Sequence, residues 1–239
     1  MEIDGHPYSY VRGFKHDFFA ATGLYGGPDG QIVLKIGRRV SLFGIPMAWT
    51  GRFLARREAA MFRLLADLEA VPRFVGMWGR GATAHDFVPG HVLRKGERVP
   101  DDFFPRLHDA IRAMHARGMA YVDLEKCENV LVGEDGRPYL FDFQIAFRLP
   151  RWARRFPPAR WLLRRFQQGD LYHLTKLQRR TRRDQLSPEV LTASYRRPVY
   201  VHVHRWLTQP FQAMRRRVLR RLDPARATGN RVERGRIDE

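Results

Sequence analysis

The chain has 239 residues, of which 44% are apolar, and this suits one sizeable domain or two small lobes. Its single cysteine, Cys127, excludes an internal disulfide and fits a reducing compartment. No stretch approaches the roughly 18 uninterrupted apolar residues of a membrane span, and the first residues lack a secretion-signal pattern. We therefore expect a cytoplasmic protein.

The net charge of +18 is concentrated in the second part of the chain. Residues 1–147 hold 19 basic and 18 acidic side chains, whereas residues 148–239 hold 24 and 7, a net of +17. A genome that favours arginine codons is one explanation, since only 5 of the 43 basic residues are lysine. Such a bias should affect both parts, so the asymmetry favours an anionic partner: nucleic acid, acidic lipid or a phosphorylated substrate.

The first 36 residues are predicted to form β structure. The segment "SYVRGFKHDFFAATGLYGG" (9–27) predicts one β segment, and the "PDG" turn after it leads into a second, "QIVLKI" (31–36). Lys35 therefore lies near the end of a predicted strand.

A helix is predicted over residues 49–70, with Thr50 as its N-cap. Apolar residues recur there at helical spacing: Phe53, Leu54, Met61, Leu64, Leu65 and Leu68. Next come a second strand pair that ends at Pro89-Gly90, a helix over 100–118 closed by Gly118, and a hairpin over 130–143. From residue 148 onward the pattern is helical and basic.

Two carboxylates lie on turns among apolar residues. Asp123 is flanked by Val122 and Leu124, and Asp142 lies within "LFDF". An unpaired carboxylate in such surroundings is costly, so function is the better explanation for both.

These segments resemble the motifs of protein kinases, in the same order along the chain. "IVLKI" resembles the strand that carries the kinase lysine, and "ARREAAMF" supplies Glu58 on the next helix. "YVDLEKCENVLV" resembles the catalytic loop with Asp123 and Asn129, and "LFDFQ" resembles the magnesium-binding turn with Asp142. The resemblance covers roughly residues 10–180 and is nearest to small atypical bacterial kinases, including lipopolysaccharide kinases and the RIO-like group.

The resemblance implies a role for each matched residue. Lys35 would hold the phosphates of ATP and Glu58 would orient it, while Asp123 would position the acceptor hydroxyl. Asn129 and Asp142 would bind Mg²⁺.

Further positions follow from the same resemblance. "DFVPGHVL" would be the hinge, so Asp86 and Val88 are expected at the nucleotide. Asp170, in "GDLYHL", would brace the catalytic loop.

The chain departs from the kinase pattern in four places. "HDFFAATG" replaces the glycine-rich phosphate loop, so either its backbone approaches the phosphates or Phe18 and Phe19 cover them. Tyr121 stands where kinases have a histidine that supports the loop, and Gln144 stands where they have a flexible glycine. Asn129 follows Asp123 by six residues instead of five, so either the loop bulges and Asn129 binds metal, or Glu128 does.

We therefore expect an α+β, two-lobed protein-kinase-like fold with an antiparallel β-rich N-terminal lobe (1–88), a helical lobe with basic C-terminal helices (89–226) and a tail (227–239). The expected function is Mg²⁺-dependent transfer of the γ-phosphoryl group of ATP to a hydroxyl of a protein Ser/Thr or of a lipopolysaccharide-type sugar.

Two alternatives remain open. One is an inactive kinase-like module that binds a protein, RNA or a membrane. The other is a nucleic-acid-binding protein that acts through the basic part. The aromatic and arginine residues of 147–166 and 211–222 suit an anionic membrane surface at the inner face of the cell membrane, although the apolar stripes equally suit packing on the helical lobe.

Overall fold

The computed structural model describes residues 1–16, 20–37 and 48–195 of the 239. Met1–Ser194 form one compact unit, and a second unit comprises Tyr195–Glu239. Within the described ranges, no helix combines the length and apolar character that crossing a membrane demands.

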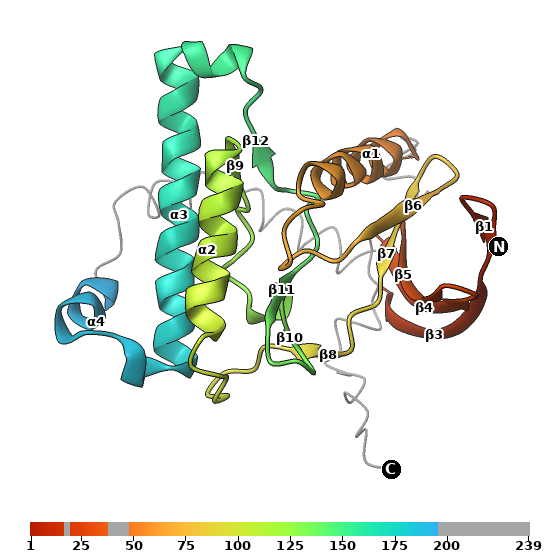
Figure 1. The fold of residues 1–239 in the computed structure, drawn as a ribbon. Helices are drawn as coiled ribbons and strands as arrows, with labels where there is room; N and C mark the ends of the chain where they lie inside the picture. Colours follow the sequence, from red (N-terminus) through yellow and green to blue (C-terminus); the bar gives the residue numbers. More distant parts are fainter. Residues whose placement is uncertain (17–19, 38–47, 196–239) are drawn as a thin grey trace, which may run out of the picture. The chain divides into compact units, whose positions relative to one another are not determined.

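The first part of the chain forms a five-stranded antiparallel sheet in the order β3-β4-β5-β7-β6 (Figure 1). Its strands are β3 (Ser9–His16), β4 (Ala20–Gly27), β5 (Gly30–Gly37), β6 (Phe74–Trp78) and β7 (Ala82–Asp86). A short hairpin of β1 (Glu2–Ile3) and β2 (His6–Pro7) precedes them. The prediction of one β segment over 9–27 is wrong, because β3 and β4 are separate strands that pair with each other. A 19-residue segment is far longer than the three to ten residues that usual strands span.

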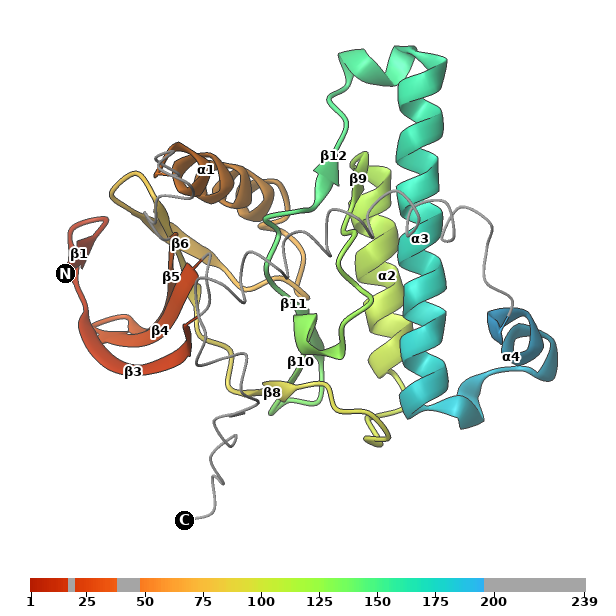
Figure 2. The same cartoon turned by 180° about the vertical axis from the view of Figure 1, so that it is seen from behind.

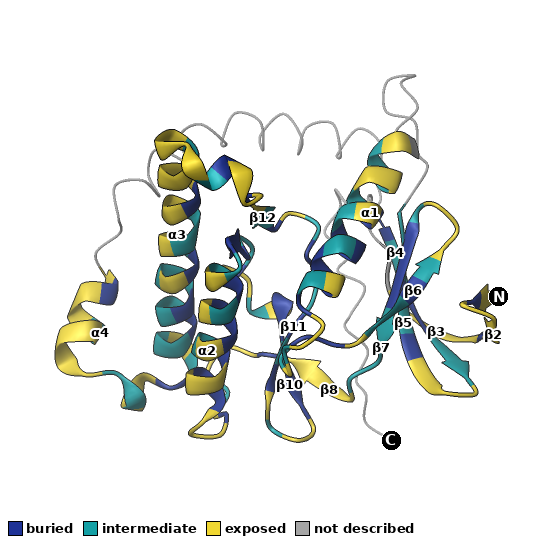
Figure 3. Ribbon diagram, turned by 45° about the horizontal axis from the view of Figure 1, so that its top comes forward, coloured by how far each residue is buried: buried dark blue, intermediate teal, exposed yellow. Residues whose placement is uncertain are grey.

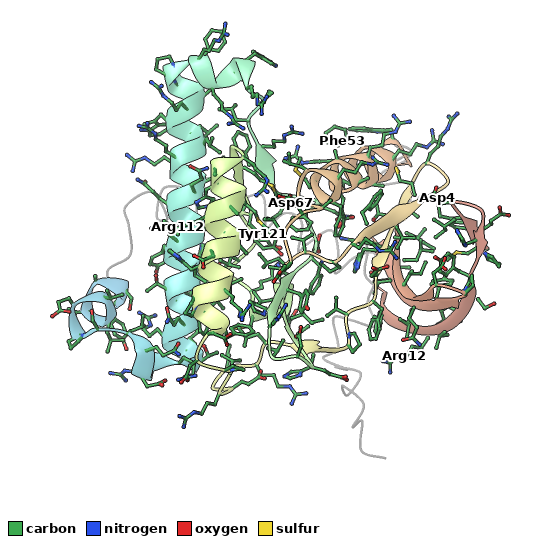
Figure 4. All side chains as sticks on the ribbon, in the orientation of Figure 1. Asp4, Arg12, Phe53, Asp67, Arg112 and Tyr121 are labelled. Carbon is green, nitrogen blue, oxygen red and sulfur yellow. The ribbon has the colours of Figure 1, made fainter. Side chains whose placement is uncertain are left out.

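Helix α1 (Ala48–Leu64) contacts β5, β6 and β7 of this sheet. Its buried face carries Ala55, Ala59 and Phe62, and also Met61 of the predicted apolar stripe. Leu65, just after the helix, belongs to the same stripe and is buried as well. Phe53 belongs to that stripe, yet it is 56% exposed on the outer side of the helix (Figure 4). The N-cap prediction for Thr50 is also wrong, since Thr50 lies inside α1.

The second part of the chain is mainly helical. Helices α2 (Phe103–Ala116) and α3 (Pro157–Thr181) lie side by side in both opposed views, and α4 (Pro188–Tyr195) follows them (Figures 1 and 2). The buried faces of α2 and α3 are turned toward the rest of the unit (Figure 3). Their apolar residues join one large core that also takes in Met61, Phe62 and Leu65 from the α1 region. The two parts of the unit therefore share a core.

The segments that connect these helices contain short strands. β8 (Gly90–Val92), β10 (Val130–Gly133) and β11 (Pro138–Leu140) form a three-stranded sheet, and β9 (Met119–Ala120) pairs with β12 (Phe147–Arg148). The described part of this unit also holds three 3₁₀ helices: η1 (Cys127–Asn129), η2 (Trp152–Arg155) and η3 (Arg183–Gln185). The predicted α+β architecture, with an antiparallel sheet first and helices second, is confirmed.

Gly118 ends α2 as predicted, and its φ of +74° explains the residue type. A Cβ at this position would also overlap the guanidinium group of Arg154. The chain therefore turns sharply from α2 into β9 and on to the loop that carries Asp123.

Candidate active site

A buried ion-pair cluster joins the sheet to the turn after β11. The Lys35 ammonium group, on β5, donates to Glu58 Oε1 of α1 at 3.1 Å and to Asp142 Oδ1 at 2.8 Å. Asp142 lies 107 positions after Lys35 in the sequence. The structure thus brings together three of the residues that the motifs singled out, and we call them the Lys35 cluster.

The burial of the Lys35 cluster is graded. The Glu58 side chain is 3% exposed, that of Lys35 is 15% exposed and that of Asp142 is 39% exposed. Burial works against the charge on Lys35, but the carboxylates of Glu58 and Asp142 outweigh it and raise the lysine pKa. Burial raises the pKa of Glu58, and the Lys35 charge opposes that rise. The cluster is closed on the Glu58 side and open to a ligand on the Asp142 side.

Thr83 completes the cluster, and the sequence analysis did not find it. Its hydroxyl on β7 donates to Glu58 Oε2 at 3.1 Å, and Thr83 lies opposite Lys35 in the sheet register. Both oxygens of the Glu58 carboxylate therefore have a donor. No motif marks this threonine; only the pairing of β5 with β7 places it beside Glu58.

The Asp142 turn is held by aromatic packing. The Phe143 ring is fully buried and meets the Phe62 ring edge-to-face at 5.1 Å and the Tyr121 ring at 5.6 Å. Arg57 of α1 also donates to the Ala146 carbonyl oxygen, just beyond the turn. Asp142 has a φ of +63°, in the left-handed region that few non-glycine residues adopt, although aspartate tolerates it better than most.

The loop that carries Asp123 is closed by Asn129. The Asn129 amide nitrogen donates to the Asp123 carbonyl oxygen at 2.8 Å, across the six-residue spacing noted in the sequence. The 3₁₀ helix η1 (Cys127–Asn129) lies within this spacing. Asn129 is buried against the loop, whereas Glu128 is exposed. Of the two candidate metal ligands, Asn129 is the one that is bonded to the Asp123 loop, and metal binding by either residue stays a prediction.

Lys126 is a second residue that the sequence analysis did not assign. Its ammonium group lies 3.1 Å from Asp123 Oδ2 and remains 61% exposed. The Asp123 side chain is 20% exposed. A carboxylate and an exposed cation therefore stand together beside the loop.

Asp170 braces the loop, as predicted. This carboxylate on α3 is 1% exposed and accepts hydrogen bonds from the backbone N–H groups of Tyr121 (2.8 Å) and Val122 (2.7 Å). It also lies 2.9 Å from His115 Nε2. Val122 has a φ of +73°, which is strained for a β-branched residue. The bonds to Asp170 hold the backbone in that conformation.

Tyr121 takes the place of the histidine found in kinases. Tyr121 is fully buried, and its hydroxyl donates to the Phe141 carbonyl oxygen and lies 3.3 Å from the Asn129 carbonyl oxygen. Burial raises the Tyr121 pKa well above the ordinary value, so the hydroxyl stays protonated as a donor. Tyr121 links the Asp123 loop, Asn129 and the Asp142 turn through one side chain.

Four further residues were predicted to contact the nucleotide, and the structure does not test those contacts. The Asp86 carboxylate forms a two-point ion pair with Arg73, at 2.8 and 3.1 Å, so it already has a charged partner. Val88 is partly buried just beyond β7. Phe18 and Phe19 lie outside the described residues. Contacts of these four residues with a nucleotide stay predictions.

The chemistry of Asn129 and Asp142 fits Mg²⁺. Mg²⁺ prefers oxygen ligands and is usually held by one or two carboxylates together with substrate phosphates. Asp142 supplies a partly exposed carboxylate, and the hydrogen bond from the Asn129 nitrogen leaves the amide oxygen for a ligand. No three His, Cys, Asp or Glu side chains of the described ranges form a metal cage. The site therefore suits a metal that arrives with phosphates.

This arrangement of lobes, loop and turn is that of the protein-kinase-like fold, and solved structures show the same fold. No known protein family and no curated protein matches the sequence. The crystal structure of Rio2 kinase from Chaetomium thermophilum with ADP/Mg²⁺-phosphoaspartate shares 19% identity and superimposes with a TM-score of 0.55, covering 75% of this chain and 58% of that one. A second crystal structure of the same kinase shares 18% identity at a TM-score of 0.54, covering 75% and 60%.

The chain therefore spans less than two thirds of the length of these kinases. At this level of identity the similarity demonstrates the fold and agrees with the RIO-like resemblance. The resemblance to lipopolysaccharide kinases stays a prediction.

Proposed function

We propose that this protein is an ATP- and Mg²⁺-dependent phosphotransferase. The observation that carries the proposal is the Lys35 cluster: a lysine, its buried glutamate and a partly exposed aspartate meet within 3.1 Å in a protein-kinase-like fold. A structural ion pair alone needs no third, half-exposed carboxylate, because the Lys35–Glu58 pair is already complete. The third group gives the cluster a side that can receive phosphates and metal.

Each residue has a task that its position supports. Lys35 binds nucleotide phosphates, and Glu58 keeps the ammonium group in place while Thr83 keeps Glu58 in place. Asp123 orients the acceptor hydroxyl and takes its proton, and Lys126 screens the negative charge that gathers beside it. Asn129 and Asp142 hold Mg²⁺, which when bound with ATP neutralises phosphate charge. Asp86, Val88, Phe18 and Phe19 line the nucleotide.

The acceptor is a hydroxyl group of a protein Ser/Thr or of a sugar lipid. The lobes responsible are 1–88 and 89–226, with 227–239 as a tail. The proposed location is the cytoplasm, where the positive charge suits contact with anionic membrane at its inner face; RNA is the alternative anionic partner.

Phosphate transfer is tested with labelled ATP and Mg²⁺ against fractionated envelope and protein extract. We expect one fraction to take label with the wild type and none with Asp123→Asn. Asp109→Asn, an exposed carboxylate on α2, serves as the matched control and should behave as the wild type. Label transfer that survives Asp123→Asn unchanged would remove the assigned role of Asp123.

Binding separates an enzyme from an inactive module. Mg²⁺-ATP should raise the melting temperature of the wild type, since a ligand that binds only the folded state stabilises it. Asp142→Ala should abolish that shift, and Asp109→Ala should keep it. A wild-type protein that neither gains stability nor transfers label would favour the inactive module.

A second candidate function is ATP hydrolysis through a phosphorylated carboxylate. One of the similar kinase structures contains phosphoaspartate with ADP and Mg²⁺, and Asp142 and Asp123 are the partly exposed carboxylates here. A carboxylate oxygen would bond to phosphorus as the bond to ADP breaks, and water would then release phosphate. Label on the protein itself that hydroxylamine removes would support this candidate over transfer to a hydroxyl.

A further inference from the structure

An exposed apolar patch lies where η2 meets α3, at residues 151–165, and we call it the η2–α3 corner. Trp152 is 68% exposed, Phe156 57%, Trp161 58% and Leu162 40%. The Trp152 and Phe156 rings pack edge-to-face on each other, and Trp161 and Leu162 follow on the first turns of α3. Large apolar side chains grouped in this way on a surface usually mark an interaction site.

The same corner is strongly basic. Its exposed charged residues are all arginines: Arg151, Arg155, Arg160, Arg164 and Arg165. The sequence contains no acidic residue between Asp142 and Asp170. Any partner of this surface must therefore offer negative charge together with an apolar layer.

The inner side of the corner is firmly packed, so the exposed rings are not core residues that failed to find a place. Ala153 and Leu163 are buried in a cluster with Ala120 and Leu149. Arg154 is the exception among the corner's arginines, because it turns inward and donates to the carbonyl oxygens of Leu149 and Arg117. The corner thus presents its rings outward from a rigid base.

We propose that the η2–α3 corner docks on an anionic lipid surface. Tryptophan and phenylalanine insert at the boundary between headgroups and acyl chains, and arginines around them bind anionic headgroups. The proposal does not rest on phosphotransfer, because it concerns binding alone. It narrows the broad expectation of a basic membrane-binding part to residues 151–165.

Other occupants fit less well. Base stacking by RNA needs open ring faces, and the Arg165 guanidinium covers one face of Trp161 at 5.2 Å. A second copy of the chain would bring like charge against like charge.

Co-sedimentation of the full chain with lipid vesicles tests the proposal. We expect binding to vesicles that contain phosphatidylglycerol to be at least about tenfold tighter than to vesicles of phosphatidylcholine alone, and to weaken in high salt. The variant Trp152→Ser/Trp161→Ser should bind the anionic vesicles about tenfold more weakly. Arg155→Gln and Arg164→Gln should each cost about fivefold.

The matched control is Trp78→Ser, at the end of β6 and 41% exposed, which should bind as the wild type. The double variant should keep its melting temperature within the spread of the control, because its side chains lie outside the core. Since binding is compared between variants of equal stability, misfolding cannot imitate the result.

Three results would overturn the proposal. The first is equal binding to anionic and neutral vesicles, and the second is unchanged vesicle binding by the double variant. The third is loss of single-stranded RNA binding, or of self-association, in the double variant while the wild type ignores vesicles. That last result would assign the corner to RNA or to a second copy.

Discussion

Two buried carboxylates, Glu58 and Asp170, hold the candidate site in different ways. Glu58 is paired with a cation whose other partner, Asp142, is 39% exposed, so the Lys35 cluster can exchange a contact when a ligand arrives. Asp170 accepts two backbone N–H groups and a histidine, and it is 1% exposed. The Lys35 cluster can therefore change its contacts when a ligand binds, whereas the hydrogen bonds of Asp170 should stay the same.

Replacing Asp170 by Asn should have the largest effect on stability, because Asp170 is the buried carboxylate that holds the loop backbone. An amide cannot accept all the hydrogen bonds that the carboxylate receives, and its own N–H groups would face backbone donors. We expect a loss of about 4 kcal/mol in the free energy of unfolding, measured by urea denaturation.

The control for that experiment is Asp109→Asn, which should stay within about 0.5 kcal/mol of the wild type. A stable Asp170→Asn variant would show that the strained backbone at Val122 is held by other contacts.

Acid should lower the folding stability of the protein through His85, which lies on β7 of the five-stranded sheet. Its ring packs on the Phe62 ring at 5.2 Å, and loss of solvent lowers the pKa of His85 from an ordinary 6.5 to about 4. Between these values the unfolded chain binds a proton that the folded protein does not. Folding stability should therefore fall by up to about 3 kcal/mol as the pH drops from 6.5 to 4.

Unfolding curves at several pH values measure this fall. The fall in stability with pH should be much smaller in His85→Gln and should stay unchanged in His91→Gln, whose ring is exposed. An unchanged slope in His85→Gln would assign the acid sensitivity to other groups.

Removing the Thr83 hydroxyl should have the smallest effect, and this effect should be confined to the Lys35 cluster. In Thr83→Val, Glu58 loses a hydrogen bond to its charged form, so its already raised pKa rises further. Protonated Glu58 no longer holds the Lys35 charge, so Mg²⁺-ATP binding should fail at a higher pH than in the wild type.

Calorimetric titration of Mg²⁺-ATP against pH measures this shift. At neutral pH we expect binding about fivefold weaker, equivalent to about 1 kcal/mol. Thr83→Ser should restore the wild-type profile. A uniform loss at every pH would show that Thr83 acts through packing alone.

The sequence alone supported the order of elements and most of the site. Lys35, Glu58 and Asp142 were assigned because a strand ending in lysine, a helix carrying glutamate and an acidic turn within "LFDF" resemble kinase motifs in the same order. Such patterns depend on neighbouring residues, and neighbouring residues determine local conformation.

Tertiary structure decided what local patterns cannot express. The division of 9–27 into two strands and the partnership of Thr83 with Glu58 both depend on which strand lies beside which. The exposure of Phe53 on α1 likewise depends on which face of the helix meets the sheet. The same holds for the aromatic residues of 147–166: Leu163 is buried while Trp152 and Trp161 are exposed, although all three carry the same apolar signal. Hydrophobicity shows which residues prefer burial, but only packing against distant segments determines which of them find a partner.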